Sequence, residues 1–235
     1  MRENSKKVLS IGVLLVVGFV IWTGLIQWID VQPVGVNGTN IGFATINVWV
    51  HSLTGVHMDL YVLTDWLGLV PVFVCMVFGG IGFVQMVQRR SVLKVDYDIL
   101  ILGIYYLLVI GCYLIFEMIP INYRPILIEG ILEASYPSST TLLVLCVMPT
   151  LVEQMNRRAN NLAMKKIIAV LVSFFSAFMV IGRLISGVHW LTDIIASLML
   201  SAGLFYIYKA IVISLDKKET LLEALSWNFT KNCRN

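Results

Sequence analysis

The chain has 235 residues, of which 58% are hydrophobic and only 13% are charged, and its mean hydropathy is +0.85. Soluble domains contain about half apolar and about a quarter charged residues. The composition therefore excludes an ordinary soluble protein and indicates a membrane protein. The net charge of +3 gives no reason to expect nucleic acid as a partner.

Long apolar runs predict an all-α fold, in which residues 1–235 form a single bundle of six transmembrane helices. Each run approaches the ~20 residues that a helix needs to cross the hydrocarbon layer. The first run follows basic residues, as in a signal peptide, but its apolar part is longer than a signal core, so we expect an uncleaved helix. The predicted spans are 8–29, 66–88, 97–117, 138–155, 165–185 and 189–213.

The distribution of positive charge predicts the orientation of these helices. All but two of the 17 Lys and Arg residues fall on one side, and the exceptions are Arg124 and Arg183. The positive-inside rule then places both termini in the cytoplasm. The segments 30–65, 118–137 and 183–188 are expected on the outer side, and the absence of a eukaryotic targeting signal favours a bacterial cell membrane.

The first outer segment, 30–65, is long, and its middle part, IGFATINVWVHSLTG (41–55), is apolar but too short for a span. We expect an interfacial or re-entrant helix that covers part of the outer face.

Neither metal nor cofactor is expected from the sequence. The cysteines fit neither a metal knuckle nor a redox pair, and the three histidines form no tight cluster with acidic residues. Small apolar packing residues are the simplest interpretation of the cysteines, which are Cys75, Cys112, Cys146 and Cys233.

Polar residues are concentrated in the segment GRLISGVHWLTD, residues 182–193. His189 and Asp193 are four residues apart and share one face of a helix. A neutral imidazole can attack phosphorus or move a proton, and the carboxylate can accept the other ring N–H. This segment therefore predicts a catalytic centre.

A phosphate-binding site is predicted beside it. Arg124 and Arg183 both lie on the outer side, and each carries a planar fork of donors that suits a phosphate group. The segment PSSTT (137–141) predicts a helix start at Pro137, whose first-turn N–H groups attract an anion.

These segments resemble the signatures of the type 2 phosphatidic acid phosphatase superfamily: Lys-x6-Arg-Pro, Pro-Ser-Gly-His and Ser-Arg-x5-His-x3-Asp. The chain has EMIPINYRP (117–125), PSST (137–140) and GRLISGVHWLTD (182–193) in the same order. The resemblance covers most of the chain. It implies a six-helix membrane enzyme that hydrolyses a lipid phosphate or diphosphate on the outer face through a phosphohistidine intermediate.

The resemblance also implies a role for each matching residue. His189 corresponds to the nucleophile and Asp193 to its orienting carboxylate. The substrate phosphate would be bound by Arg124, Arg183, and the turn that contains Ser138 and Ser139.

Three positions depart from the family pattern. Glu117 stands where the family has lysine, and Gly182 replaces the serine before the arginine. Thr140 stands where the family has the histidine that protonates the leaving oxygen. Loss of a general acid typically costs ~10²–10⁴ in rate, so this chain is expected to be a slow or inactive natural copy, or one in which the histidine was deliberately replaced.

Several local interpretations remain open. Either His51 or His57 replaces the missing acid, or both are merely interfacial loop residues. Glu117 is interpreted either as a substitute for the lysine or as a structural ion-pair partner of Arg124.

The overall function also has alternatives. The substrate candidates are undecaprenyl diphosphate, which we favour, phosphatidylglycerophosphate and phosphatidic acid, and membrane lipids surround the chain. A second hypothesis is an inactive protein that binds, transports or scaffolds lipid phosphates, and a third is a small transporter unrelated to phosphate. The sequence does not indicate an oligomeric state.

Overall fold

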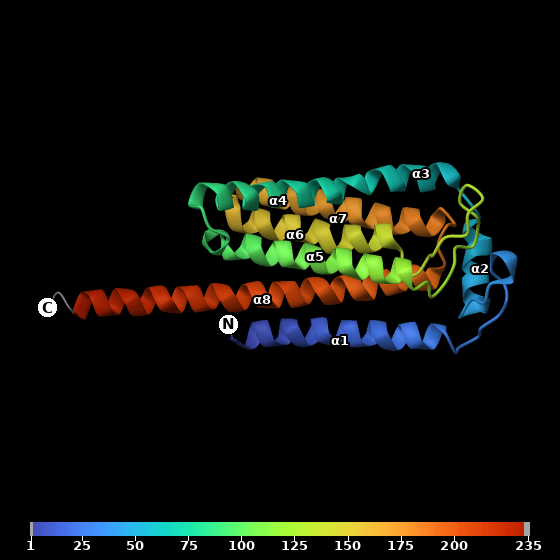
Figure 1. Cartoon of the computed structure of the whole chain (residues 1–235), viewed down its shortest axis with the longest axis horizontal. Helices are drawn as coiled ribbons and strands as arrows, with labels where there is room; N and C mark the ends of the chain where they lie inside the picture. The colour runs from blue at the N-terminus through green and yellow to red at the C-terminus, as the bar shows by residue number, and fades with distance from the viewer. Residues whose placement is uncertain (1, 233–235) are drawn as a thin grey trace.

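The computed structural model describes residues 2–232 and consists of long helices that run side by side, crossed at one end by a short helix (Figure 1). We call the crossed end the α2 end. The elements are α1 (Arg2–Ile26), η1 (Val36–Gly38), α2 (Ala44–Thr54), α3 (Met58–Leu67), α4 (Leu69–Arg89), η2 (Val92–Lys94), α5 (Tyr97–Met118), α6 (Ser139–Arg158), α7 (Leu162–Ile185) and α8 (Leu191–Asn232).

Five stretches of the described chain are helical, long and apolar enough to cross a membrane, which makes this a multi-pass membrane protein. α6 also runs within the bundle, where it packs against α4, α5, α7 and α8, but its ends are more polar. The predicted all-α fold is therefore confirmed, while the sixth span remains a prediction. The five stretches are Asn4–Ile26, Met58–Arg89, Tyr97–Met118, Leu162–Ile185 and Leu191–Lys218.

The helical stretch that contains the second predicted span begins before residue 66. α3 begins at Met58 and meets α4 at Gly68, so that the apolar helical stretch covers Met58–Arg89. The hydropathy pattern did not indicate the helical residues before 66, because Asp59 and Asp65 interrupt the apolar run. Both residues are helical in the structure, with exposed side chains. The extent of the first outer segment, predicted as 30–65, stays a prediction.

The last helix is longer than the predicted span 189–213. α8 begins at Leu191 and continues to Asn232, because residues 214–232 contain neither proline nor glycine to end it. Cys233 lies outside the described residues.

The short apolar segment expected at 41–55 forms α2, which lies across the ends of the long helices (Figure 1). Asn47 is fully buried and attaches α2 to the start of α8. Its amide nitrogen donates to Thr192 Oγ1 at 3.0 Å, and its amide oxygen accepts the Thr192 N–H at 3.2 Å. The first turn of α8 is thereby fixed.

Packing between α5, α6 and α8 fixes the position of α6 along the bundle. The Tyr105 and Tyr208 rings lie 4.9 Å apart between centroids, and the Tyr105 hydroxyl donates to the Cys146 carbonyl at 3.1 Å. At the end opposite α2, Arg158 binds the buried Asp98 carboxylate at 2.6 Å. These contacts hold α6 so that its first turn lies at the α2 end.

Candidate active site

The turn between α7 and α8 carries His189 and is packed tightly against the loop between α2 and α3. Gly187 has φ +72°, and a Cβ atom built on it would lie 2.0 Å from the Gly55 carbonyl oxygen. The His57 N–H donates to the Ser186 carbonyl at 3.0 Å. Only glycine fits position 187 without moving one of the two loops.

We expect Gly187→Ala to lower thermal stability and activity together. Positive φ costs a non-glycine residue roughly 1–2 kcal/mol, and the clash with Gly55 adds to that cost. Gly130→Ala is a matched control, because Gly130 has φ +80° and nothing lies within 4 Å of its added Cβ. Thermal unfolding in detergent measures the difference, and equal losses for the two variants would contradict the close packing of the two loops.

His189 is 3% exposed and has a defined partner at each ring nitrogen. Its Nδ1 lies 3.1 Å from the Ser135 carbonyl oxygen, which can only accept, so Nδ1 carries the proton. Its Nε2 lies 3.3 Å from Arg183 Nη2. Burial, together with the charges of Arg124 and Arg183, holds the pKa of His189 well below its usual value of 6.5. The ring is therefore neutral at pH 7, with its lone pair on Nε2.

Asp193 is fully buried, but its carboxylate is not the nearest partner of the imidazole. Its Oδ2 lies 3.7 Å from His189 Nδ1 and accepts the Trp190 N–H at 3.0 Å, while Oδ1 accepts from Asn122 Nδ2 at 3.4 Å. The Ser135 carbonyl is thus the nearest partner of Nδ1, Asp193 is a second neighbour of the same nitrogen, and the orienting role of Asp193 stays a prediction.

Arg183 lies at the end of α7 with 1% exposure and faces α3. Its Nη1 lies 3.4 Å from Thr64 Oγ1 and 3.6 Å from Asp65 Oδ1. Gly182 permits this approach, because a Cβ there would lie 2.8 Å from Thr64 Cγ2. The replacement of the family's serine by glycine therefore brings α3 close to the site.

Arg124 and Arg183 converge on a tyrosine that the sequence gave no reason to select. Arg183 Cζ lies 4.9 Å, and Arg124 Cζ 5.7 Å, from the centre of the Tyr61 ring. Such cation–π contacts hold cations in place without neutralising them. The two predicted phosphate-binding arginines are thus brought together from separate segments of the chain.

Several donors of these arginines are buried without a hydrogen-bond partner. They are the Nε and Nη1 atoms of Arg124 and the Nε atom of Arg183. The Arg124 Nε atom lies 2.9 Å from Glu133 Oε2, but this ion pair lacks hydrogen-bond geometry. Buried unsatisfied donors are uncommon and call for a reason, and a bound anion supplies one.

The two serines predicted to bind phosphate differ in their environment at the start of α6. Ser138 is the N-cap residue and is fully buried, and its hydroxyl donates to Thr141 Oγ1 at 3.0 Å. Ser139 and Thr140 follow it and are partly exposed. The first N–H groups of an α-helix have no partner within the helix, so the backbone and Ser139, rather than the Ser138 hydroxyl, are available to an anion.

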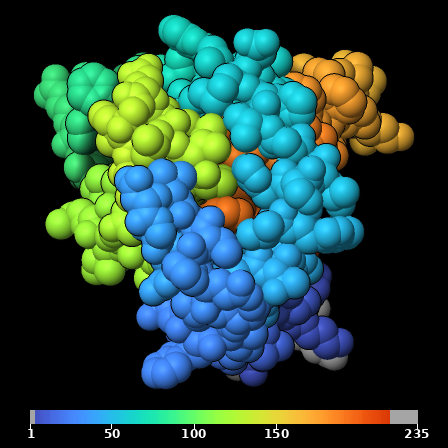
Figure 2. Space-filling model, turned by 90° about the vertical axis from the view of Figure 1, so that its right-hand side faces the viewer, coloured from blue at the N-terminus to red at the C-terminus, as the bar shows by residue number. Residues whose placement is uncertain are grey.

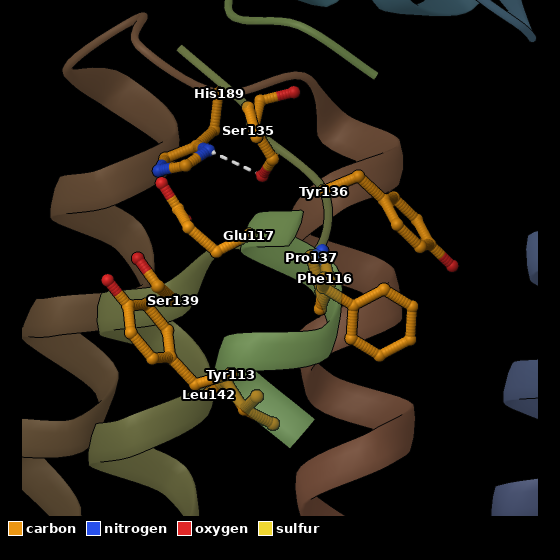
Figure 3. Close-up of a pocket in the computed structure, with 10 residues that line it drawn as sticks. Tyr113, Phe116, Glu117, Ser135, Tyr136, Pro137, Ser139, Leu142 and His189 are labelled. Atoms are coloured by element: carbon orange, nitrogen blue, oxygen red, sulfur yellow. Dashed lines mark hydrogen bonds between the residues drawn. The ribbon is translucent and has the colours of Figure 1, made fainter. Parts of the chain in front are cut away.

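Glu117 lies at the end of α5, and its carboxylate points toward the His189 ring (Figure 3). Both residues line one small pocket, together with Ser139 and Tyr113. The alternative in which Glu117 forms an ion pair with Arg124 is not supported, because Glu133 takes that place at 2.9 Å.

The other two histidines lie outside this pocket. His51 Nε2 is 3.1 Å from the Gly187 carbonyl oxygen, and His57 Nε2 is 2.9 Å from the Thr54 carbonyl oxygen. Neither ring lines the pocket that His189 borders, so the geometry gives no support to either as a replacement acid.

A larger cavity of about 480 Å³ adjoins the site between α3, α4, α5 and α6. Asp65, Ser139 and Thr140 form its polar end. The remaining wall is mostly apolar and includes Leu69, Val72, Val109, Ile110, Leu143 and Val147.

The α2 end covers most of the turn that bears His189. Figure 2 looks onto this end, where the turn (orange) shows only in gaps between the 27–43 segment (blue), α2 and α3 (cyan) and the 119–137 segment (yellow-green). Trp190 Nε1 donates to the Tyr123 carbonyl at 2.8 Å and attaches this last segment to the turn. Among the described residues, no cluster of three or more His, Cys, Asp or Glu side chains could hold a metal ion.

Comparison with known proteins places this site in a family. A search of curated proteins finds no match. The first transmembrane PAP2-type phosphatidylglycerolphosphate phosphatase from Bacillus subtilis has a similar crystal structure, with a TM-score of 0.57 and 19% identity over 88% of this chain and 96% of that chain. The model of the PAP2 superfamily matches residues 73–215, which include the buried arginines, the start of α6 and His189, and the chain therefore belongs to the PAP2 superfamily.

Proposed function

We propose that this protein is a membrane phosphatase that removes phosphate from a lipid phosphate or diphosphate by way of a phosphohistidine on His189. One observation carries the proposal: buried arginines with unsatisfied donors converge beside the lone pair of a neutral imidazole. Both Arg183 and the first turn of α6 offer N–H groups to the substrate phosphoryl group. No metal or other cofactor is needed for this chemistry.

His189 Nε2 attacks phosphorus, and the Ser135 carbonyl holds the opposite ring N–H. As charge develops on the phosphoryl oxygens, Arg124 and Arg183 stabilise it from fixed, water-poor positions. The Nε2 lone pair is free to attack once the substrate phosphate engages Arg183, which otherwise donates to it at 3.3 Å.

The apolar cavity supports a lipid as the substrate. Its volume of about 480 Å³ lies within the ~300–1,000 Å³ of typical small-molecule sites, and its polar end includes Asp65, which lies 3.6 Å from Arg183. A lipid chain along α4 and α5 would leave its headgroup at Ser139 and Thr140. A diphosphate is the favoured substrate, because phosphate leaves more readily than an alkoxide, and undecaprenyl diphosphate is the candidate of this class.

The charge distribution supports an outward-facing site. The α2 end bears the site, whereas Arg89, Arg157 and Arg158 lie at helix ends opposite it, which the positive-inside rule assigns to the cytoplasm. We propose that α6 is a sixth span and that both termini are cytoplasmic.

An inactive lipid-phosphate binder is the second candidate. It is favoured by the carboxylate of Glu117, which points at the nucleophile where the family has a cation, and by Thr140, whose hydroxyl is too weak an acid to protonate a leaving group. Such a protein would bind lipid phosphates through Arg124 and Arg183 without releasing phosphate.

Phosphate release from a panel of lipids tests the proposal. The protein is reconstituted in sealed vesicles with the α2 end outward, and undecaprenyl diphosphate, phosphatidylglycerophosphate and phosphatidic acid are supplied outside. We expect phosphate to appear outside, fastest from the diphosphate. Binding without release would favour the inactive binder, preference for a monophosphate would overturn the substrate ranking, and release only into the lumen would overturn the orientation.

A further inference from the structure

The site lacks an evident proton donor for the leaving oxygen. In an in-line displacement the leaving oxygen departs on the side of phosphorus opposite His189 Nε2. A lipid chain in the apolar cavity places that oxygen at the cavity's polar end, beside Thr140. Glu117 does not meet this need, because it lines the small pocket beside His189 (Figure 3) and does not line this cavity.

Another carboxyl group lies on the required side. Asp65 belongs to the last turn of α3 and lines the cavity together with Thr140. A Cβ atom built on Gly68 would lie 2.9 Å from the Asp65 carbonyl oxygen and 3.3 Å from Thr140 Cγ2, so the last turn of α3 packs directly on Thr140. Asp65 is thus the nearest acidic residue of α3 to the position that the family's histidine would occupy.

The Asp65 carboxylate is also coupled to the phosphate-binding arginine. Its Oδ1 lies 3.6 Å from Arg183 Nη1, and its side chain is 59% exposed, whereas that of Arg183 is 1% exposed. A substrate phosphate that binds Arg183 displaces this ion-pair partner and brings its own negative charge close to the carboxylate. The Asp65 side chain then lies beside the bound phosphate and remains in contact with water.

We propose that Asp65 is a catalytic residue of this chain and carries the proton that a histidine at position 140 would otherwise carry. This inference rests on the phosphatase function proposed above. It assigns to α3 a role in the chemistry, in addition to its contacts with Arg183.

The proton balance of both steps follows from this assignment. In the first step, His189 Nε2 forms a bond to phosphorus, the bond from phosphorus to the lipid oxygen breaks, and the Asp65 carboxylic acid gives its proton to that oxygen. In the second step, a water molecule attacks phosphorus and gives a proton to the Asp65 carboxylate. The bond between phosphorus and Nε2 breaks, its electron pair returns to His189, and phosphate leaves.

Leaving groups of different basicity test the inference. Dodecyl phosphate releases an alkoxide that needs a proton, whereas para-nitrophenyl phosphate releases a phenolate that does not. We expect Asp65→Asn to lower kcat with dodecyl phosphate by about 10²–10⁴-fold, with little change in KM. With para-nitrophenyl phosphate, the same variant should release one equivalent of nitrophenolate rapidly and then turn over slowly, because the second step lacks its base.

The matched control is Asp59→Asn. Asp59 is an exposed acid in the first turn of the same helix and does not line the cavity that Asp65 and Thr140 border, so we expect wild-type kinetics. The amplitude of the nitrophenolate burst measures the concentration of folded, active protein, so a folding defect can be distinguished from a loss of catalysis. Asp65→Glu should retain more activity than Asp65→Asn.

A rescue experiment completes the test. In the Asp65→Asn background, the added Thr140→His change should raise kcat at least about tenfold. In the wild-type background, where Asp65 is present, the same change should raise kcat less than about tenfold. The inference would be overturned if Asp65→Asn kept unchanged activity. It would also be overturned if the variant slowed the first turnover equally for both substrates and raised KM, because Asp65 would then only support Arg183. If the wild type gives neither burst nor turnover with any substrate, the phosphatase proposal itself fails, and this inference fails with it.

Discussion

Replacing His189 with glutamine is expected to lower kcat by on the order of 10⁴–10⁶-fold, the effect typical of removing a catalytic nucleophile. Glutamine has a similar reach, and its amide can still bond to the Ser135 carbonyl and to Arg183, so the fold should persist. Binding of a lipid phosphate should also persist, because the arginines remain. Phosphate release and lipid binding are measured on the same preparation.

His51→Gln is the control for this experiment. His51 lies 3.1 Å from the Gly187 carbonyl oxygen of the same turn, but its ring does not line the pocket of His189. We expect at most a severalfold change for this variant. Activity that survives in His189→Gln would show that another group attacks phosphorus.

Arg183→Lys is expected to lower kcat by about 10²–10³-fold, the loss typical when one donor to a developing oxyanion is removed. Lysine keeps the charge of this buried position but loses the planar fork, because its ammonium group is a compact point charge without the two parallel N–H donors of a guanidinium. The loss should appear in steady-state kinetics without a comparable loss of thermal stability.

Arg89→Lys provides the comparison at the opposite end of the bundle. Arg89 is 43% exposed and pairs with Asp96 at 2.7 Å, and such surface pairs contribute only ~0–1 kcal/mol. Kinetics equal to the wild type are expected there. If Arg183→Lys were equally harmless, the converging arginines would not form the phosphate site.

The sequence was sufficient to select candidate residues that the structure brings together, but not the partners of these residues. Arg183, His189 and Asp193 stand out because ionisable residues are rare in apolar helices and usually functional. The partner that fixes the imidazole is the Ser135 backbone carbonyl, and a backbone group leaves no mark on the sequence. The predicted pairing with Asp193 was chemically reasonable, but the turn directs that carboxylate to the Trp190 N–H.

The contribution of α3 was missed for a related reason. Hydropathy assigned Tyr61 and Asp65 to a loop, because the acidic residues obscured the start of the span. The position of both side chains then depends on how closely α3 approaches α7, which the absence of a side chain at Gly182 makes possible. A carboxylate at the edge of an apolar helix was the available signal for Asp65, whereas Tyr61 had none.

The most direct measurement of the central claim is the detection of phosphohistidine. Vesicle-reconstituted protein is mixed with lipid diphosphate labelled in its terminal phosphate and stopped within one turnover, and the denatured chain is then exposed to acid or alkali. We predict covalent label that survives alkali, is lost in acid, is absent from His189→Gln and accumulates in Asp65→Asn. Label that resists acid, or label that persists in His189→Gln, would contradict the account.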